Sequence, residues 1–290
     1  MSLKKAVIWG HPLYSHTHSF IHYAFFKAFL AMGYETYWLD NSSDLSGLNL
    51  ANSLFITECQ VDQDIPLRKD CKYVLHNCAP EKYQGLASIN LQVYNIDVSH
   101  DWQKIAPFTY FDGRTLYQPW ATDLLPSEIE GILEEGLEEE ARDEKTCAWI
   151  GTVGEGLYGN LNELTPFIKE CEKNGVRWRA VMNIPFEENR KMIRSSWLAP
   201  AITGGWQTEH GYIPCRMFKN ASYGKLGITN SAQTRDIMDG LVAYSQDTAE
   251  LFYKALEARS DLKMIRRAAQ HVAAHHTYLN RIENMLKVLP

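Results

Sequence analysis

Gly211-Tyr-Ile-Pro-Cys-Arg-Met-Phe-Lys-Asn-Ala-Ser-Tyr-Gly-Lys-Leu-Gly-Ile-Thr-Asn-Ser231 is the stretch around which this chain is organised. Its pattern predicts a loop, one short helix, a tight turn at Gly224 and a buried strand. Arg216 and Lys219 lie three residues apart, so they share a face in the first helical turn, where free backbone N–H groups point outward. Two cations at a helix start predict a site for a phosphate or pyrophosphate.

Polar residues of the same stretch extend this predicted site. The backbone amides near the end of the helix are expected to face the same anion, and the predicted strand ends in a polar residue at the edge where α/β sheets bind ligands. These further candidates are Asn220, Ser222, Tyr223 and Asn230, the last for a ribose or pyrophosphate. An isolated R-x-x-K is more often a solvated surface helix, so the flanking sequence has to decide between the two interpretations.

The flanking sequence resembles a known family. Arg216-x-Phe218-x5-Gly224 resembles the R-x-F-E-x-x-A-x-G signature of the C-terminal domain of GT-B-fold, "group 1"-type glycosyltransferases. The similarity continues in the Gly loop that follows Trp149, in a strand-like segment and in a terminal h-T-Y-x-x-R pattern. These segments are residues 149–154, 241–247 and 276–281, so the resemblance spans about residues 147–286.

The resemblance implies the architecture. We expect an α/β, GT-B-like fold with two Rossmann-like domains facing a central cleft. The expected divisions are an N-terminal acceptor domain (1–125), an acidic linker (126–145) and a C-terminal nucleotide-sugar donor domain (146–275), with a terminal helix (276–290) that packs back on the first domain. The acidic run from Glu128 to Lys145 is also consistent with an ordinary solvated helix.

The resemblance also implies an activity. It indicates a metal-independent glycosyltransferase that needs no cofactor and moves a sugar from a UDP- or GDP-linked donor to a glycan or other hydroxyl acceptor. One departure matters: the family has Glu where this chain has Lys219, and a Lys suits a phosphate better than a hydroxyl. The alternatives are a non-catalytic nucleotide- or glycan-binding module, which this departure favours, and a sugar-nucleotide epimerase.

Composition sets the general class. The chain has 290 residues, 45% hydrophobic and 22% charged, as expected for a globular protein with one or two domains. Its net charge of −6 argues against nucleic acid as a partner, and it has no apolar run long enough for an integral membrane segment. The six cysteines lack metal-like spacing and are expected to be free, mostly buried thiols in the cytoplasm. The oligomeric state stays open.

The N-terminal half predicts a parallel α/β sheet. Residues 5–10 form an apolar strand, Ser19 caps a helix that runs to about Met32, and residues 34–39 form the next strand. Further strands are expected at residues 53–59, 72–78 and 89–94. The first β-α turn lacks G-x-G-x-x-G, so the usual dinucleotide-binding fingerprint is absent.

A glycine-rich loop opens the second half. Residues 151–159 read Gly-Thr-Val-Gly-Glu-Gly-Leu-Tyr-Gly and follow an expected strand at residues 146–150. Glycines let the backbone approach a phosphate or sugar closely, so Gly151, Thr152 and Gly154 are candidate donor contacts. A flexible turn without a ligand explains the same composition equally well.

The candidate proton acceptors lie in the first half. His11, His16 and His18 follow the first strand, and His16 is the preferred base, because a neutral imidazole accepts a proton near pH 7. Glu58 and His76 sit at two further strand ends and are the other catalytic candidates. A single His is more often structural, and a retaining enzyme needs no such base, so inversion and retention stay open. No carboxylate pair follows a strand as a metal site would require.

Overall fold

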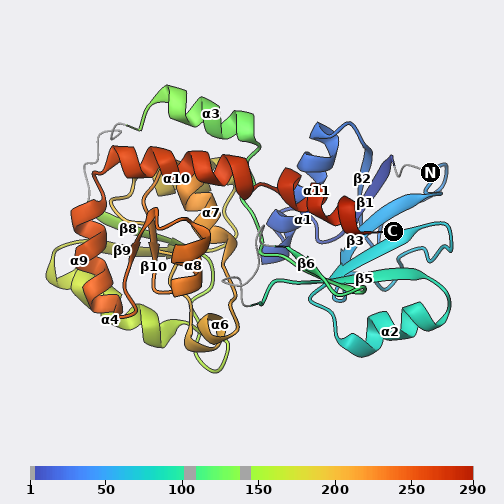
Figure 1. Ribbon diagram of the computed structural model, residues 1–290, viewed down its shortest axis with the longest axis horizontal. Coiled ribbons are helices and arrows are strands. Elements are labelled where there is room, and N and C mark those ends of the chain that lie inside the picture. The colour runs from blue at the N-terminus through green and yellow to red at the C-terminus, as the bar shows by residue number, and fades with distance from the viewer. Residues whose placement is uncertain (1–3, 101–108, 138–144, 290) are drawn as a thin grey trace. The chain divides into compact units, whose positions relative to one another are not determined.

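The structure is a computed structural model that describes residues 4–100, 109–137 and 145–289. The chain forms two compact units, whose elements are labelled in Figure 1. Unit 1 comprises Met1–Asp97, Thr109–Gln118 and Tyr278–Pro290, and unit 2 comprises Val98–Phe108 and Pro119–Thr277. This division differs from the expected boundaries, because residues 119–125 and the expected linker belong to unit 2, whereas residues 98–108 interrupt unit 1.

Unit 1 is built on a seven-stranded sheet with the order β2-β1-β3-β4-β5-β7-β6. Neighbouring strands pair in parallel, apart from the antiparallel pair of β6 and β7. The strands are β1 (Lys5–Trp9), β2 (Glu35–Leu39), β3 (Ser53–Glu58), β4 (Lys72–His76), β5 (Gln92–Asp97), β6 (Tyr110–Phe111) and β7 (Thr115–Tyr117). The helices are α1 (Thr17–Ala31), α2 (Pro80–Ser88) and α11 (Tyr278–Val288).

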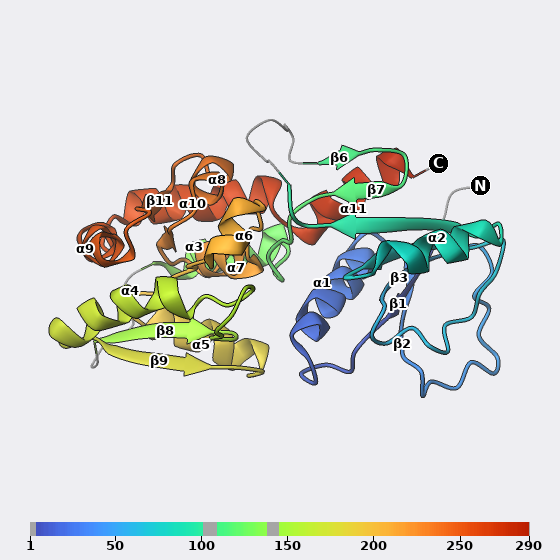
Figure 2. The same ribbon diagram turned by 90° about the horizontal axis from the view of Figure 1, so that it is seen from below.

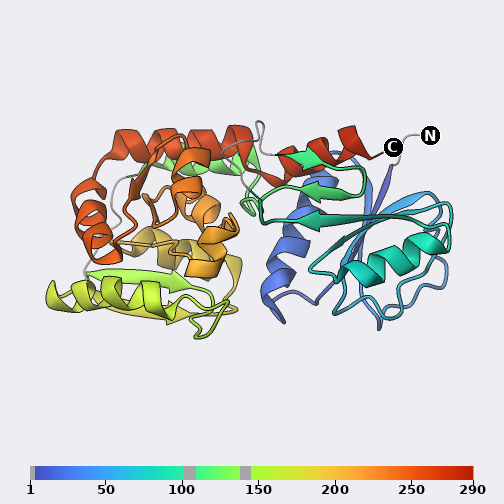
Figure 3. The same cartoon turned by 60° about the horizontal axis from the view of Figure 1, so that its bottom comes forward.

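Helices cover both faces of this sheet. The chain moves one way along the sheet through β1-α1-β2 and the other way through β4-α2-β5, and right-handed crossovers in opposite directions put their helices on opposite faces (Figure 3). One core cluster lies on the α2 face and contains Trp9, Phe55 and Tyr73. On the other face α11 packs against α1, where Phe25 meets Tyr278 edge-on.

The strand order creates one special position in unit 1. Strand β1 lies between β2, which follows it in the chain, and β3, so the direction of the connections reverses between β1 and β3. In open α/β sheets, ligands bind beyond the carboxyl ends of the strands at such a reversal point. The loop that starts at Gly10 and the end of β3 at Glu58 both lie at this edge.

Unit 2 contains two parallel strand pairs, β8–β9 and β10–β11. Residues 197–203 run between them, since Ala148 N donates to Leu198 O and Ala201 N donates to Ile228 O. Figure 2 shows β8 and β9 side by side with α4 along them. The strands are β8 (Thr146–Ile150), β9 (Arg177–Val181), β10 (Gly227–Thr229) and β11 (Val242–Tyr244). The helices are α3 (Pro126–Glu135), α4 (Leu161–Lys173), α5 (Phe186–Ser195), α6 (Gly205–Glu209), α7 (Cys215–Ser222), α8 (Ala232–Ile237), α9 (Thr248–Ala258) and α10 (Leu262–His275).

Several predicted elements have different bounds or caps. Helix α1 begins two residues before the predicted cap Ser19, because His16 takes the cap position and its Nδ1 accepts from His18 N. The predicted linker contains helix α3, whose Ile129 and Ile132 are buried; the rest of the acidic run, at 138–144, lies outside the described residues. No helix within the described ranges is both long and apolar enough to cross a membrane.

Candidate active site

Arg216 is held against the end of β8 in unit 2. Its Nε donates to Ile150 O at 2.9 Å, and its guanidinium carbon lies 3.6 Å from the centre of the Trp149 ring. Burial lowers the pKa of this side chain to about 10, which still leaves it charged at neutral pH. In the part of the chain that the structure describes, no acidic side chain pairs with it. A desolvated cation without a carboxylate partner is costly, and a bound anion removes that cost.

The glycine-rich loop lies directly beside this cation. Gly151 has a φ of 138°, and a Cβ placed on it would come within 2.2 Å of an Arg216 terminal nitrogen, so only glycine fits. Asn160 tightens the loop, because its Oδ1 accepts from Gly154 N and its own N–H donates to Gly154 O. Thr152 is exposed, as expected of a candidate contact. The structure therefore brings Gly151 and Arg216 together, although 65 positions separate them in the sequence.

Lys219 has different surroundings from Arg216. Its Nζ lies 3.8 Å from Asp123 Oδ1 and 5.5 Å from the centre of the Phe186 ring. Asp123 also accepts from the Tyr223 hydroxyl at 2.8 and 2.9 Å. The charge of Lys219 is thus partly neutralised inside unit 2, and sequence reasoning missed Asp123, since no local pattern marks it. Arg216 is the stronger candidate for an anionic ligand.

Four other candidates serve as internal connections rather than as outward-facing groups. Asn220 Nδ2 donates to Ala199 O, and Asn230 makes hydrogen bonds through both amide atoms to Thr203. Ser222 contacts Thr122 Oγ1 at 2.7 Å, and Tyr223 is bound to Asp123 as described above. All four are buried. These side chains hold α7 and β10 in place, and the contact of Asn220, Ser222, Tyr223 and Asn230 with a ligand stays a prediction.

An aromatic group is exposed next to the glycine-rich loop. Tyr158 is 67% exposed and meets Trp206 edge-on, with ring centres 4.8 Å apart. Trp206 in turn stacks on His210 at 4.1 Å. Gly205, at the start of α6, donates its N–H to Glu163 in the first turn of α4, which fixes the two segments relative to each other. Sequence reasoning did not single out these three rings.

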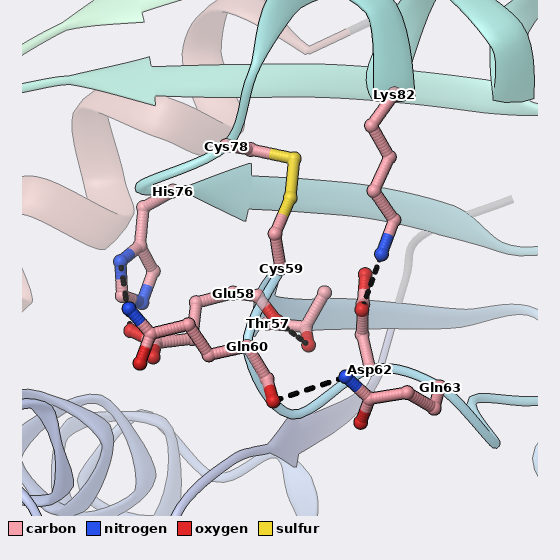
Figure 4. The surroundings of a disulfide bond; sticks show 9 residues. All are labelled: Thr57, Glu58, Cys59, Gln60, Asp62, Gln63, His76, Cys78 and Lys82. Atoms are coloured by element: carbon pink, nitrogen blue, oxygen red, sulfur yellow. Dashed lines mark hydrogen bonds and ion pairs between the residues drawn. A yellow bond between two sulfur atoms is a disulfide. The ribbon is translucent and has the colours of Figure 1, made fainter.

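Strand register assembles a second cluster at the reversal point of the unit 1 sheet. In the pairing of β3 with β4, Glu58 lies opposite His76, and β1 runs along the other side of β3. His11 Nε2 lies 2.6 Å from Glu58 Oε1, and His18 Nδ1 makes a short hydrogen bond to Glu58 Oε2. Figure 4 shows Glu58 and His76 at neighbouring strand ends. Glu58 thus lies near both other predicted catalytic residues, His16 on one side of the cluster and His76 on the other.

The hydrogen bonds of this cluster define its protonation. Burial by itself would raise the pKa of Glu58, but the hydrogen bond and charge of His18, together with the hydrogen bond from His11, lower it to about 2, so the carboxylate is ionised and both imidazoles donate to it. His11 N donates to His22 Nδ1, which leaves the proton of neutral His22 on Nε2, 2.9 Å from His76 Nε2. His76 then carries its proton on Nδ1, which faces Glu58 Oε2 at 3.7 Å.

Burial keeps the two inner histidines neutral. It lowers the pKa of His76 to about 3 and that of His22 well below its ordinary value. Sequence reasoning missed His22, although His18 and His22 lie four residues apart and so share a face of one helix, a spacing that indicates a shared site.

His16 is a poor general base in this arrangement. Its Nδ1 accepts from His18 N at 3.2 Å to cap α1, so in the neutral ring the proton is on Nε2 and no lone pair is left for a substrate proton. Burial and the neighbouring imidazoles of His11 and His18 lower its pKa, which favours this neutral form. The geometry therefore does not support the prediction that His16 is the preferred base, and Glu58 with His18 is the better candidate.

We expect Gly10→Ala to disrupt this cluster. A Cβ at position 10 would lie 2.1 Å from His22 Nδ1, in a fully buried site that has no room to yield. Overpacking of this kind typically costs about 1–3 kcal/mol. Urea unfolding should show the loss, and Gly85→Ala, at a helical glycine of α2 where a Cβ meets nothing within 4 Å, is the matched control. Equal stability of the two variants would contradict the close approach of Gly10 and His22.

A disulfide joins the strand ends that carry Glu58 and His76. Cys59 and Cys78 are bonded, with their Cα atoms 5.2 Å apart, as Figure 4 shows. This corrects the prediction that all six cysteines are free, and the other four, Cys71, Cys147, Cys171 and Cys215, are free. The cause is again parallel pairing, since residues 19 apart in the sequence end up side by side when two strands end at the same edge. The prediction of a reducing compartment rested on free cysteines, and Cys59 and Cys78 no longer support it.

Comparison with known proteins places the fold. No protein-family model matches the chain, and no curated protein sequence matches it. Solved structures do. An alpha-glucosyltransferase in complex with UDP and a 13-mer DNA containing a HMU base has a TM-score of 0.62 at 11% identity, over 100% of both chains. An alpha-glucosyltransferase in complex with UDP has a TM-score of 0.60 at 12% identity, over 99% of this chain and 100% of the other.

These structures also correct the prediction that excluded nucleic acid. A further match, an alpha-glucosyltransferase with UDP and a 13-mer DNA containing a central A:G mismatch, has a TM-score of 0.58 at 10% identity over the full length of both chains. Structures with this fold thus include DNA complexes, and the exclusion was wrong because a net charge of −6 averages over a surface on which local fields differ. The predicted α/β, GT-B-like fold is confirmed: the chain shares the fold of these glucosyltransferases over its whole length.

Proposed function

We propose that this chain is a glycosyltransferase that moves a sugar from a nucleoside diphosphate sugar to a hydroxyl acceptor. One observation carries the proposal: Arg216 is a half-buried cation at a strand end, beside a glycine-rich loop, with no acidic partner among the described residues. A guanidinium in this position matches a phosphate, because its planar donors bind two oxygens at once.

The chemistry of the leaving group explains why such a cation is useful. When the glycosidic bond to the donor breaks, negative charge develops on the diphosphate, and a fixed cation in a water-poor site stabilises that charge. Arg216 is fixed by its bond to Ile150 O and its position over Trp149, so it does not have to reorganise. Gly151 leaves room for the guanidinium itself, since a Cβ at this position would collide with it. Lys219, paired with Asp123, adds a weaker field.

The donor is proposed to be a UDP-sugar. UDP is the nucleotide in the matched alpha-glucosyltransferase structures. The exposed ring of Tyr158, within the glycine-rich loop, and the partly exposed ring of Trp206 beside it offer faces on which a base or sugar can stack. The acceptor is proposed to be a hydroxyl group. Matched structures hold DNA with a HMU base, so modified DNA belongs among the acceptors to test, next to glycans and small hydroxyl compounds.

A donor and acceptor panel tests the proposal. Untagged full-length protein is incubated with UDP- and GDP-sugars, with no acceptor, with small sugars and glycans, or with HMU-containing DNA, while nucleoside diphosphate release is measured. We expect slow UDP release alone and faster release with one acceptor class. We also expect unchanged UDP affinity in EDTA, because Arg216 replaces a metal at the diphosphate. Tight UDP binding without turnover on any acceptor would instead indicate a binding module, and conversion of the donor sugar without UDP release would indicate an epimerase.

A further inference from the structure

The cluster in unit 1 combines residues that also bind metals. His11, His16, His18 and Glu58 each offer a ligand atom, and these atoms lie within 4.8 Å of one another. We infer that His11 Nε2, His18 Nδ1 and the Glu58 carboxylate bind a divalent transition-metal ion such as Zn²⁺, with one coordination position left open. This inference goes beyond the proposed sugar transfer and does not depend on it, since Arg216, the residue proposed to bind the diphosphate, lies in unit 2.

The distances suit a metal that replaces protons. The ionised carboxylate of Glu58 accepts one N–H from His11 at Oε1 and one from His18 at Oε2, so two ring nitrogens and two carboxylate oxygens are joined by two protons that a metal ion can replace. Bonds of about 2.0–2.2 Å in a tetrahedral site separate ligand atoms by about 3.3 Å. The present separation of 2.6 Å between His11 Nε2 and Glu58 Oε1 therefore needs only a small outward movement. Both imidazoles are partly exposed, at 13% and 22%, so an ion has access to them.

The surroundings orient the central ligand. Metal-binding carboxylates are normally held by further hydrogen bonds, and such outer partners are worth 10–100-fold in affinity. Here the Nδ1 of buried His76 faces Glu58, and His76 is itself bound to His22, whose ring fits closely under Gly10. Glu58 is therefore fixed by a chain of buried groups that cannot rotate freely.

The donor set selects the class of metal. Two imidazoles and one carboxylate suit Zn²⁺, Co²⁺ or Ni²⁺, whereas Mg²⁺ prefers oxygen ligands alone. Cys59 and Cys78, which follow Glu58 and His76 in the sequence, are joined in a disulfide and therefore offer no thiolate ligand. His16 is occupied as the cap of α1 through Nδ1, so it leaves the fourth position to an oxygen ligand such as water or a hydroxyl. Three protein ligands with an open position are typical of catalytic rather than structural zinc sites.

Direct metal binding tests this inference. Untagged full-length protein is stripped with a chelator, dialysed and titrated with Zn²⁺ in a calorimeter, and Co²⁺ is added separately to record its visible absorption. We expect saturable Zn²⁺ binding, a Co²⁺ spectrum characteristic of a low-symmetry nitrogen and oxygen site, and no Mg²⁺ binding. Stripped wild-type protein that binds neither Zn²⁺ nor Co²⁺ would overturn the inference and leave the cluster as a proton-sharing network.

Variants locate the site. Glu58→Gln and His18→Ala should abolish saturable Zn²⁺ binding, and His76→Gln should weaken it by roughly 10–100-fold. His275→Gln, at an exposed histidine of α10 in unit 2, is the control and should bind like wild type. Circular dichroism checks that each variant folds. If Glu58→Gln does not fold, the Zn²⁺ affinities of His11→Ala and His18→Ala test the inference instead. Unchanged Zn²⁺ affinity in these folded variants would overturn the inference, whereas UDP affinity, measured in parallel, reports separately on the proposed function.

Discussion

Arg216→Ala is expected to weaken UDP binding by roughly 10–150-fold. The guanidinium is half-buried, fixed over Trp149 and without an acidic partner in the described residues, so the proposed diphosphate would be its charge-assisted partner. Loss of one such hydrogen-bonded contact typically costs about 1.5–3 kcal/mol, which corresponds to that range of dissociation constants. Isothermal titration calorimetry with UDP in EDTA measures the effect without interference from a bound metal.

A matched control distinguishes weaker UDP binding caused by loss of Arg216 from the general effect of removing an arginine that stacks on a tryptophan. Arg259 also lies over a tryptophan of unit 2, with its guanidinium carbon 4.1 Å from the Trp197 ring centre, but it has no place in the proposed donor site. Arg259→Ala should therefore bind UDP like wild type. Lys219→Ala should have a smaller effect than Arg216→Ala, because Asp123 already pairs with Lys219. Wild-type UDP affinity in folded Arg216→Ala protein would refute the assignment of the diphosphate site.

Glu58→Gln is expected to lower the free energy of unfolding at pH 7 by about 3 kcal/mol. The pKa of Glu58 is lowered from 4.5 to about 2, because the hydrogen bond and charge of His18 and the hydrogen bond from His11 outweigh the effect of burial. Each unit of such a shift corresponds to about 1.4 kcal/mol. A carboxylate with a depressed folded-state pKa stabilises the fold above its unfolded-state pKa, and this stabilisation is lost as the pH falls from about 4.5 towards 2.

The expected pH profile follows from that sign. In urea unfolding with EDTA, wild type should lose stability relative to Glu58→Gln as the pH is lowered from 7 to about 3, so the difference between the two proteins shrinks. Glu35→Gln, at a half-exposed carboxylate of β2 in the same unit, should show little difference from wild type at either pH. A constant difference across this range would mean that Glu58 does not owe its stabilising effect to its ionised form.

The sequence by itself predicted most of the parallel strands of unit 1 and marked one candidate binding residue, Arg216. The apolar runs of β1, β3 and β4 are signals of strand formation that need no knowledge of the rest of the chain. The same holds for the helix that carries Arg216 and for Gly151, since a cation at a helix start and a glycine after a strand are local patterns. Local patterns also indicated which strand ends carry polar residues.

Tertiary structure decided which polar residues point at a possible ligand and which hold the fold together. Asn230 and Arg216 are both polar residues near element ends, yet Asn230 is used up by Thr203 whereas Arg216 keeps its terminal nitrogens beside Gly151. No local sequence pattern tells these two cases apart, because a polar side chain near an element end can bind either a ligand or the protein itself.

The same limit explains the histidine cluster and the disulfide. His11, Glu58 and His76 come together only because parallel register sets β1, β3 and β4 side by side with their carboxyl ends at one edge. That register also brings Cys59 to Cys78. Propensity and spacing act over a few residues, whereas the pairing of β3 with β4 joins positions 18 residues apart and that of β1 with β3 joins positions 48 apart, so these contacts could be assigned only in the folded chain.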